Sequence, residues 1–182
     1  LNIKNLHDEL TELINKSLNG QRKFELIYVD DGSTDDTFLR LDNLKKKNFD
    51  LKLIKNNKNL SQSIALYNGI NNSKFDNLIF LDGDGQNDPN DIARMLLEFE
   101  KGNDLVHGYR KNRKDNFFTK KVPSIIANHI VRMISNSKII DHGCTLKIIK
   151  KKFLDNKILW GDFHRLLAAR VNSEKLKIVQ FE

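Results

Sequence analysis

The sequence is organised around one stretch, LIFLDGDGQNDP, which runs from Leu78 to Pro89. It opens with four apolar residues and continues into an acidic turn that contains two glycines. A short unbroken apolar run that ends at Gly and Asp is typical of a buried strand in a parallel sheet. Ligands of open α/β sheets bind just outside the carboxyl ends of the strands. The acidic turn is therefore expected to lie where a ligand binds.

The residue types of this turn suit a divalent metal. Asp82 and Asp84 are two residues apart, so on an extended chain both carboxylates face the same side, and Gln86 adds a neutral oxygen there. Hard oxygen ligands of this kind suit Mg²⁺ or Mn²⁺ that also holds a substrate phosphate. Asp88 followed by Pro89 predicts the N-cap and first position of the next helix.

Two other motifs that begin with a D-x-D pattern fit less well. An EF-hand loop that starts at Asp82 needs Gly at its sixth position and Glu at its twelfth, where this chain has Asn87 and Ala93. The haloacid-dehalogenase-type phosphatases have Thr or Val at the position of Gln86. The first motif is rejected, and the second is weakened.

Composition narrows the class of protein. A chain of 182 residues with 39% hydrophobic and 30% charged residues fits one globular domain with its own core. No run of about 18 apolar residues is present. The single cysteine, Cys144, excludes an internal disulfide, and a buried thiol is favoured over a nucleophile. The net charge of +7 favours anionic partners. No set of stacked aromatic residues interleaves with the basic ones, so nucleic acid is the least favoured partner.

Strand and helix patterns alternate along the chain, which predicts a doubly wound α/β sheet. Apolar residues at helical spacing predict a first helix that carries Ile3 to Ile14 and ends at Gly20. Phe38, Leu41 and Leu44 predict a second helix, and Ser33 or Thr34 is its expected cap. Further strands are expected at residues 24–29, 51–54, 78–81, 105–107 and 176–181, further helices at 61–72, 89–100, 120–136 and 163–171, a basic loop at 109–119, and a short strand or helix after 141–147.

A second acidic cluster, Asp30 and Asp31, also follows a predicted strand. In a parallel sheet the two clusters meet at one edge, so one can bind a base or ribose while the other holds a metal on a diphosphate. The chain has no P-loop, no G-x-G-x-x-G turn for a nicotinamide cofactor and no G-x-S-x-G elbow.

Five pieces of the sequence together resemble the family 2 glycosyltransferases of GT-A fold, and most closely the polyprenyl-phosphate, dolichol-phosphate mannosyltransferase-like branch. The resemblance implies a Rossmann-like three-layer fold with a mostly parallel central sheet. It also implies a nucleoside-diphosphate sugar donor linked to GDP or UDP, a divalent metal and a polyprenyl phosphate acceptor. The pieces are VDDGSTD (29–35), LDGDGQNDP (81–89), GYRKNRKD (108–115), DHGCTLK (141–147) and GDFHR (161–165).

The resemblance implies a donor site and a metal site. Asp30 and Asp31 would contact the nucleotide. Asp82, Asp84 and Gln86 would hold the metal and the diphosphate, with Asp82 also part of the donor site and Asp84 counted as catalytic.

The resemblance also implies an acceptor site. Arg110 would contact the phosphates at the reaction centre, and Asp141 would lie near the sugar and orient one of its hydroxyls. A lipid phosphate is already ionised at neutral pH, so in-line attack needs no strong general base and inverts the anomeric centre. For His164, a packing role is the alternative. The acceptor phosphate would be contacted by Arg113, Lys120, Ser124, His164 and Arg165.

Two departures from the family pattern concern its ends. The family opens with a strand that ends in a Pro-x-Tyr-Asn-Glu-like segment, and LNIKNL (1–6) resembles the residues that come after that segment. The family's basic His-x-x-Arg stretch is also absent. Residues 1–182 are therefore expected to be a single catalytic domain without its first strand and its C-terminal end, and to be poorly active alone. Equal turnover by this chain and a longer one would contradict that expectation.

Other functions stay open at this point. The acceptor can instead be a polysaccharide or a protein, and the lipid can be dolichol or undecaprenol. A receiver-type signalling domain also binds Mg²⁺ at an acidic strand end, but it needs a lone phosphoacceptor Asp and a Lys after a late strand. With a lipid acceptor, the expected location is the cytoplasmic face of the membrane, either peripheral or anchored by segments outside this chain.

Overall fold

The computed structural model describes residues 3–17, 22–44, 50–109, 139, 141, 143–154 and 176–181. The chain divides into two compact units. In the described part of the chain, the first unit contains the residues up to position 76 and residues 82–94. The second unit contains residues 77–81 and most of the chain after residue 94. A single catalytic domain over residues 1–182 stays a prediction.

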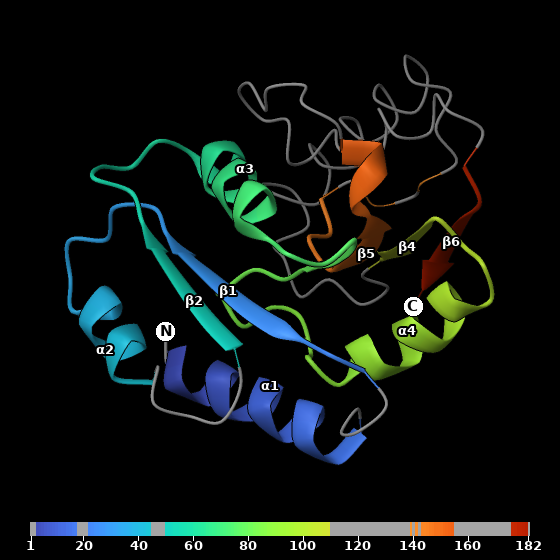
Figure 1. The fold of residues 1–182 in the computed structure, drawn as a ribbon, viewed down its shortest axis with the longest axis horizontal. Helices are drawn as coiled ribbons and strands as arrows, with labels where there is room; N and C mark the ends of the chain where they lie inside the picture. Colours follow the sequence, from blue (N-terminus) through green and yellow to red (C-terminus); the bar gives the residue numbers. More distant parts are fainter. Residues whose placement is uncertain are drawn as a thin grey trace, which may run out of the picture. The chain divides into compact units, whose positions relative to one another are not determined.

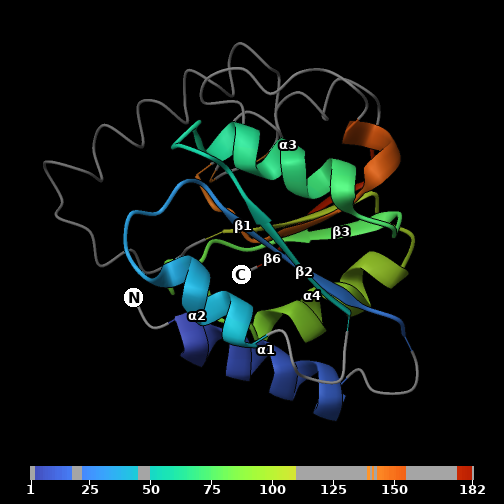
Figure 2. The same ribbon diagram turned by 60° about the vertical axis from the view of Figure 1, so that its left-hand side comes forward.

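The first unit is built on a parallel pair of strands. β1 (Glu25–Asp30) and β2 (Asp50–Lys55) pair in register along their whole length. β1 is rich in β-branched and aromatic residues, which favour extended backbone. Helix α3 (Gln62–Asn72) lies on one face of the pair, and α2 (Thr37–Leu44) lies on the other with α1 (Ile3–Ser17) beside it (Figure 1 and Figure 2). Parallel strands need such helical crossovers.

Each helix of this unit buries an apolar stripe. In α1, Leu6, Leu10 and Leu13 are at most 8% exposed and recur every three or four residues, as on one helical face. Leu41 of α2 and Ile70 of α3 are buried in the same way. The predicted first helix is confirmed, and its expected cap at residue 20 lies outside the described residues.

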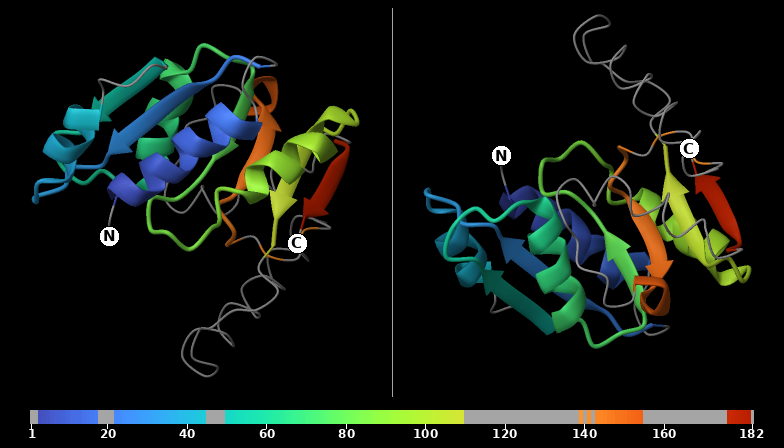
Figure 3. Two further views of the ribbon diagram at one scale, coloured as in Figure 1. Left: turned by 90° about the horizontal axis from the view of Figure 1, so that it is seen from below. Right: turned by 90° about the horizontal axis from the view of Figure 1, so that it is seen from above.

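The second unit contains a mixed four-stranded sheet. Its strands are β3 (Asn77–Phe80), β4 (Leu105–Gly108), β5 (Lys147–Lys150) and β6 (Ile178–Phe181), in the spatial order β3-β5-β4-β6 (Figure 3). β5 runs antiparallel to β3 and β4, whereas β4 and β6 are parallel. All four residues of β4 are buried, as expected for a central strand. A short 3₁₀ helix, η2 (Lys151–Leu154), follows β5.

The α/β class is confirmed, and every expected strand is found within two residues of its predicted bounds in the described part of the chain. The antiparallel pairs around β5 make the four-stranded sheet mixed rather than parallel. The expected helices at 120–136 and 163–171 lie outside the described residues, as does the basic loop after Tyr109. No helix in the described ranges combines the length and the apolar character that crossing a bilayer requires.

The beginnings of two helices differ from the predictions. Helix α4 (Asp91–Glu100) begins two residues after Pro89, because residues 88–91 first form a turn in which the Asp91 N–H donates to the Asp88 carbonyl at 3.1 Å. Helix α2 begins at Thr37, whose N–H donates to Asp35 Oδ1 at 3.0 Å.

The prediction that Ser33 or Thr34 caps α2 is therefore wrong, and the side chain that accepts an N–H of the first turn is that of Asp35. Its carboxylate lies two residues before Thr37, close enough to satisfy an otherwise unpaired N–H of the first turn. Hydrogen bonds from Thr37 lower the pKa of Asp35, because they stabilise its charged form.

Candidate active site at the acidic turns

The first acidic turn begins with a buried carboxylate at the end of β1. Asp30 is 4% exposed, and its Oδ1 accepts the N–H of Ser33 at 3.0 Å. Its Oδ2 is buried and has no hydrogen-bond partner among the described residues. A buried polar atom of this kind is costly unless a donor reaches it. Asp30 is therefore suited to accept a hydrogen bond from a group outside the described part of the chain.

The next carboxylate, Asp31, links the loop after β1 to the segment between β2 and α3 by hydrogen bonds. It accepts hydrogen bonds from Asn56 Nδ2 at 2.7 Å, from the N–H of Leu60 at 3.0 Å and from the N–H of Ser61 at 2.9 Å. Both of its oxygens are used, and the donors all belong to the segment between β2 and α3. Asp31 thus fixes that segment to the end of β1. Its predicted contact with a nucleotide is not tested.

Gly32 completes this first turn and has no room for a side chain. Its φ is +77°, and a Cβ would lie 2.4 Å from the backbone carbon of Lys58. A Cβ essentially never comes so close to an atom of a distant residue, so the backbone of residues 58–59 packs directly on the glycine. Gly32 is therefore needed for the close packing of residues 58–59 at the end of β1.

The second acidic turn follows β3 and is exposed over residues 83–86. The predicted turn is confirmed, since residues 83–85 form a turn in which Gly85 has a φ of +72°. The extended backbone that would place the carboxylates of Asp82 and Asp84 on one side is not found here. Asp84 Oδ1 accepts the N–H of Gln86 at 3.0 Å, and Asp82 Oδ1 accepts Gln62 Nε2 at 2.7 Å. The glycines allow the chain to curl, so the two carboxylates do not line up along an extended strand.

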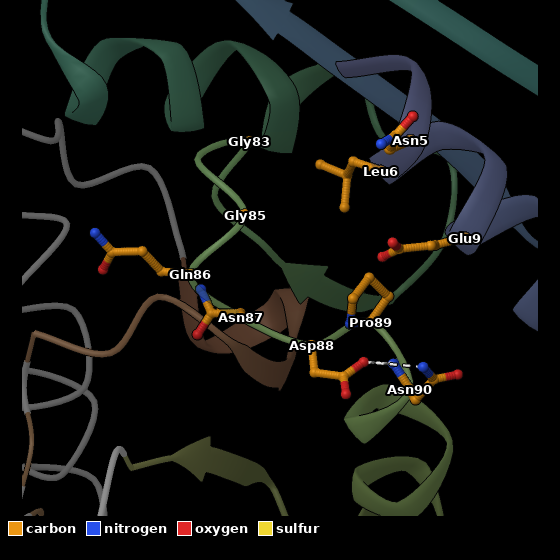
Figure 4. Close-up of a pocket in the computed structure, with 10 residues that line it drawn as sticks. All are labelled: Asn5, Leu6, Glu9, Gly83, Gly85, Gln86, Asn87, Asp88, Pro89 and Asn90. Atoms are coloured by element: carbon orange, nitrogen blue, oxygen red, sulfur yellow. Dashed lines mark hydrogen bonds between the residues drawn. The ribbon is translucent and has the colours of Figure 1, made fainter. Parts of the chain in front are cut away.

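A hollow of about 610 Å³ lies beside this turn (Figure 4). The carboxylate of Glu9 points toward the turn, whereas the side chain of Gln86 points away from α1. Asp88 Oδ1 accepts both the N–H and the Nδ2 of Asn90, at 2.9 and 3.0 Å, which stiffens the wall. The lining residues are Asn5, Leu6, Glu9, Gly83, Gly85, Gln86, Asn87, Asp88, Pro89 and Asn90.

A metal is consistent with this turn. In the described ranges, no group of three or more His, Cys, Asp and Glu side chains could hold a metal ion. Mg²⁺ and Mn²⁺ need fewer, because one or two carboxylates, several waters and the substrate phosphates complete their coordination. Asp82 and Asp84 on one glycine-containing turn are a donor set of that kind.

In the second unit, Asp141 and Cys144 form a turn before β5. Asp141 is 6% exposed, its Oδ1 accepts the N–H of Gly143 at 3.1 Å, and its carbonyl accepts the N–H of Cys144 at 3.2 Å. The thiol is 3% exposed, which confirms the buried cysteine. Gly108 at the end of β4 packs on this turn, since a Cβ there would lie 3.2 Å from Cys144 Sγ.

The other predicted site residues fall outside the described part of the chain. They are Arg110, Arg113, Lys120, Ser124, His164 and Arg165. The structure adds one residue that the sequence did not indicate, Gln62, through its hydrogen bond to Asp82. The two residues are far apart in the sequence, and a glutamine at the start of a helix matches none of the motifs considered.

Comparison with solved structures defines the class of fold. The chain resembles glucosyl-3-phosphoglycerate synthase from Mycobacterium tuberculosis with a TM-score of 0.65 and 16% identity, over 98% of this chain and 64% of that one. A structure of the same synthase with Mn²⁺, uridine-diphosphate-glucose and glycerol 3-phosphate gives a TM-score of 0.61 and 17% identity, over 95% and 64% of the two chains. The fold is the GT-A fold of glycosyltransferases.

The family follows from the sequence. The family model of Glycosyl transferase family 2 matches residues 3–163, so the chain belongs to that family.

Two curated relatives point to one branch of the family. A dodecaprenyl-phosphate galacturonate synthase from Rhizobium johnstonii is 38% identical over 151 residues, which cover 82% of this chain and 45% of the relative. An undecaprenyl-phosphate 4-deoxy-4-formamido-L-arabinose transferase from Proteus mirabilis is 30% identical over 186 residues, which cover 99% of this chain and 56% of the relative. This chain thus spans about half the length of each relative.

Proposed function

We propose that this chain is the core of a metal-dependent glycosyltransferase that moves a sugar from a nucleoside-diphosphate sugar to a polyprenyl phosphate, with inversion at the anomeric carbon. The observation that carries the proposal is the similarity to two relatives named for polyprenyl phosphates, over 82% and 99% of this chain. The exposed acidic turn after β3 supplies the hard oxygen ligands that such a reaction needs.

In this proposal the donor is held by the two acidic turns. Asp82 and Asp84 would hold Mg²⁺ or Mn²⁺, which would supply positive charge next to the leaving diphosphate. Gln86 is exposed and lies in the same turn. The buried Oδ2 of Asp30 accepts an N–H or O–H of the base or ribose. The Mn²⁺ and uridine-diphosphate-glucose in a structure of the same fold support a metal-bound donor.

The acceptor phosphate is assigned to basic residues of the chain. Arg110 contacts the phosphates at the reaction centre, because an arginine can hold two anionic substrates together despite their repulsion. Asp141 orients a sugar hydroxyl, and its attachment to a rigid turn before β5 supports a positioning role. The net charge of +7 favours an anionic acceptor. The remaining contacts are assigned to Arg113, Lys120, Ser124, His164 and Arg165.

The reaction is expected to take place at the cytoplasmic face of a membrane. A polyprenyl chain is too apolar to leave the bilayer, so only its phosphate reaches the site. The basic character of the chain suits a surface of anionic lipids.

A transfer assay tests this proposal. The full-length protein is given labelled UDP- and GDP-sugars together with undecaprenyl phosphate in vesicles, with Mn²⁺ or with EDTA. We expect a labelled lipid that forms only with Mn²⁺ and falls by roughly 100-fold or more in Asp84→Ala. Transfer to an added oligosaccharide instead of the lipid would support the saccharide acceptor. A folded protein that binds neither nucleotide would overturn the transferase proposal.

A further inference from the structure

We propose that Gln62 is a positioning residue of the metal site, and that Asp31 acts at a distance by fixing the segment that carries Gln62. The inference rests on the proposed function, because it assigns a role to a residue that touches Asp82. All the residues involved belong to the first unit.

One hydrogen bond joins α3 to the second acidic turn. Gln62 Nε2 donates to Asp82 Oδ1 at 2.7 Å, and this contact is partly buried. An amide donor restricts the rotamer of a carboxylate and leaves its negative charge in place, whereas a lysine or arginine would neutralise it. Gln62 can therefore orient Asp82 toward a cation without competing with the cation for charge.

The residue before Gln62 has a strained backbone. Ser61 has a φ of +106°, the one positive φ of a non-glycine residue in the described ranges. Such a conformation is energetically unfavourable for a residue with a side chain, and it persists only when the surrounding structure imposes it. The Ser61 carbonyl also accepts the N–H groups of Ile64 and Ala65, both at 3.1 Å, so α3 begins at this strained residue.

Asp31 imposes this conformation. Its two oxygens accept the N–H groups of Leu60 and Ser61 at 3.0 and 2.9 Å. Charge-assisted hydrogen bonds to successive amides are among the strongest that a loop can have. The position of the first turn of α3, and with it that of Gln62, is therefore set from the end of β1.

A second connection holds the same helix one turn further along. Asn56 is 6% exposed and donates from Nδ2 to Asp31 Oδ1 at 2.7 Å, while its Oδ1 accepts Asn68 Nδ2 at 2.8 Å. Asn68 lies on α3, so the helix is attached to Asp31 both through its first residues and through its second turn. The helix cannot slide along β1 without breaking these bonds.

These contacts form a chain from Asp31 through Ser61 and Gln62 to Asp82. Residues that orient a metal ligand typically change metal affinity by about 10- to 100-fold when they are replaced. The first acidic turn would thus serve the metal site through geometry, by keeping the amide of Gln62 opposite the carboxylate of Asp82.

The test is a Mn²⁺ titration in the presence of UDP or GDP, whichever the wild-type protein binds. Gln62→Met removes the donor and keeps the length of the side chain, and Gln62→Ala removes it with a different change in packing. Asn71→Met is the matched control, since Asn71 is an exposed amide on the same helix. We expect the half-saturating Mn²⁺ concentration to rise by about 10- to 100-fold in both Gln62 variants and to stay unchanged in the control.

Nucleotide affinity at saturating Mn²⁺ separates positioning from general damage. We expect it to stay within about twofold of wild type in Gln62→Met, because a residue that only orients a metal ligand loses its effect once the metal is bound. We also expect the increases in half-saturating Mn²⁺ concentration caused by Asp31→Asn and Gln62→Met to be less than additive in the double variant. Both substitutions act on the one contact between Gln62 and Asp82.

Folded Gln62 variants with a wild-type Mn²⁺ midpoint would overturn the inference and leave the proposed function intact. Fully additive shifts would overturn the role of Asp31. Absence of Mn²⁺-dependent nucleotide binding in the wild-type protein would instead overturn the proposed function itself.

Discussion

The two acidic turns of this chain have similar sequences and different environments. Asp31, after β1, accepts three hydrogen bonds from a separate loop. Asp84, after β3, is exposed and accepts the N–H of Gln86 in its own turn. The carboxylate of Asp31 stabilises the fold, and the carboxylate of Asp84 is exposed at the surface. An Asp-rich strand end can therefore be a structural link or a ligand site, and only the hydrogen-bond partners of its carboxylates distinguish the two.

The glycines of the two turns show the same difference, and replacing them gives the largest expected effect. Gly32 and Gly85 both have positive φ, but a Cβ on Gly32 would collide with the backbone of Lys58, whereas nothing lies within 4 Å of one on Gly85. We expect Gly32→Ala to lower the free energy of unfolding by roughly 4 kcal/mol, from strain and overpacking together, and Gly85→Ala by about 1 kcal/mol from strain alone. Urea unfolding measures both, and equal losses would contradict the difference.

The carboxylates themselves are the next test. Asp31→Ala removes three hydrogen bonds to a charged acceptor and leaves their donors partly buried, so we expect a loss of about 3 kcal/mol in unfolding free energy. Asp84→Ala removes one bond within an exposed turn, and we expect a change within about 0.5 kcal/mol. Chemical denaturation at neutral pH compares the two. An equally small loss of unfolding free energy in Asp31→Ala and Asp84→Ala would show that the hydrogen bonds of Asp31 do not stabilise the fold.

Asp104 extends the comparison to the second unit and to pH. Its Oδ1 accepts Lys150 Nζ at 2.6 Å and its Oδ2 accepts the N–H of Lys177 at 3.2 Å, so it links β4 to the strands on either side. The hydrogen bond from Lys150 lowers the pKa of Asp104. A lowered pKa in the folded state stabilises the protein above the ordinary Asp pKa of about 3.9, and this contribution is lost as the pH falls through the lowered value.

We therefore expect Asp104→Asn to cost about 2 kcal/mol at pH ~7 and progressively less below pH ~4. Unfolding of wild type and variant between about pH 2.5 and about pH 7 gives the difference. A cost that is the same at both ends of this range would contradict a charged link.

The smallest expected effect concerns the start of α2. Asp35 Oδ1 accepts the N–H of Thr37, so Asp35→Ala should lower the melting temperature, although by less than Asp104→Asn because the cap is exposed. Thr34→Ala is the matched control and should leave it unchanged. The reverse order would restore Thr34 as the cap.

The strands were predictable because the residues within each strand are enough to indicate extended structure. The apolar runs at Leu26–Val29 and Leu78–Leu81 are each bounded by polar residues, and both form strands. β5 was ambiguous, because only two isoleucines separate its terminal lysines and such a short run fits a strand or a helix. Four polar residues in a row, at positions 33–36, precede α2, so the choice of its cap depends on the detailed path of the backbone.

The site was predictable in part. The acidic residues could be identified because they follow strands, and family resemblance assigned them to a donor. Their partners could not be predicted, since the bonds of Asp31 to Leu60 and of Asp82 to Gln62 join residues 20 or more positions apart. The curl of the second turn depends on the φ of Gly85, which the sequence permits but does not require.

The most direct test measures binding and stability on the same two variants. Isothermal titration of UDP and GDP with and without Mn²⁺, together with urea unfolding, is applied to wild type, Asp84→Asn and Asp31→Asn. We predict that Asp84→Asn keeps the unfolding free energy of the wild type and loses Mn²⁺-dependent nucleotide binding. Asp31→Asn is predicted to lower the unfolding free energy. Mn²⁺-dependent binding that survives in Asp84→Asn would contradict the assignment of the second acidic turn as the metal and donor site.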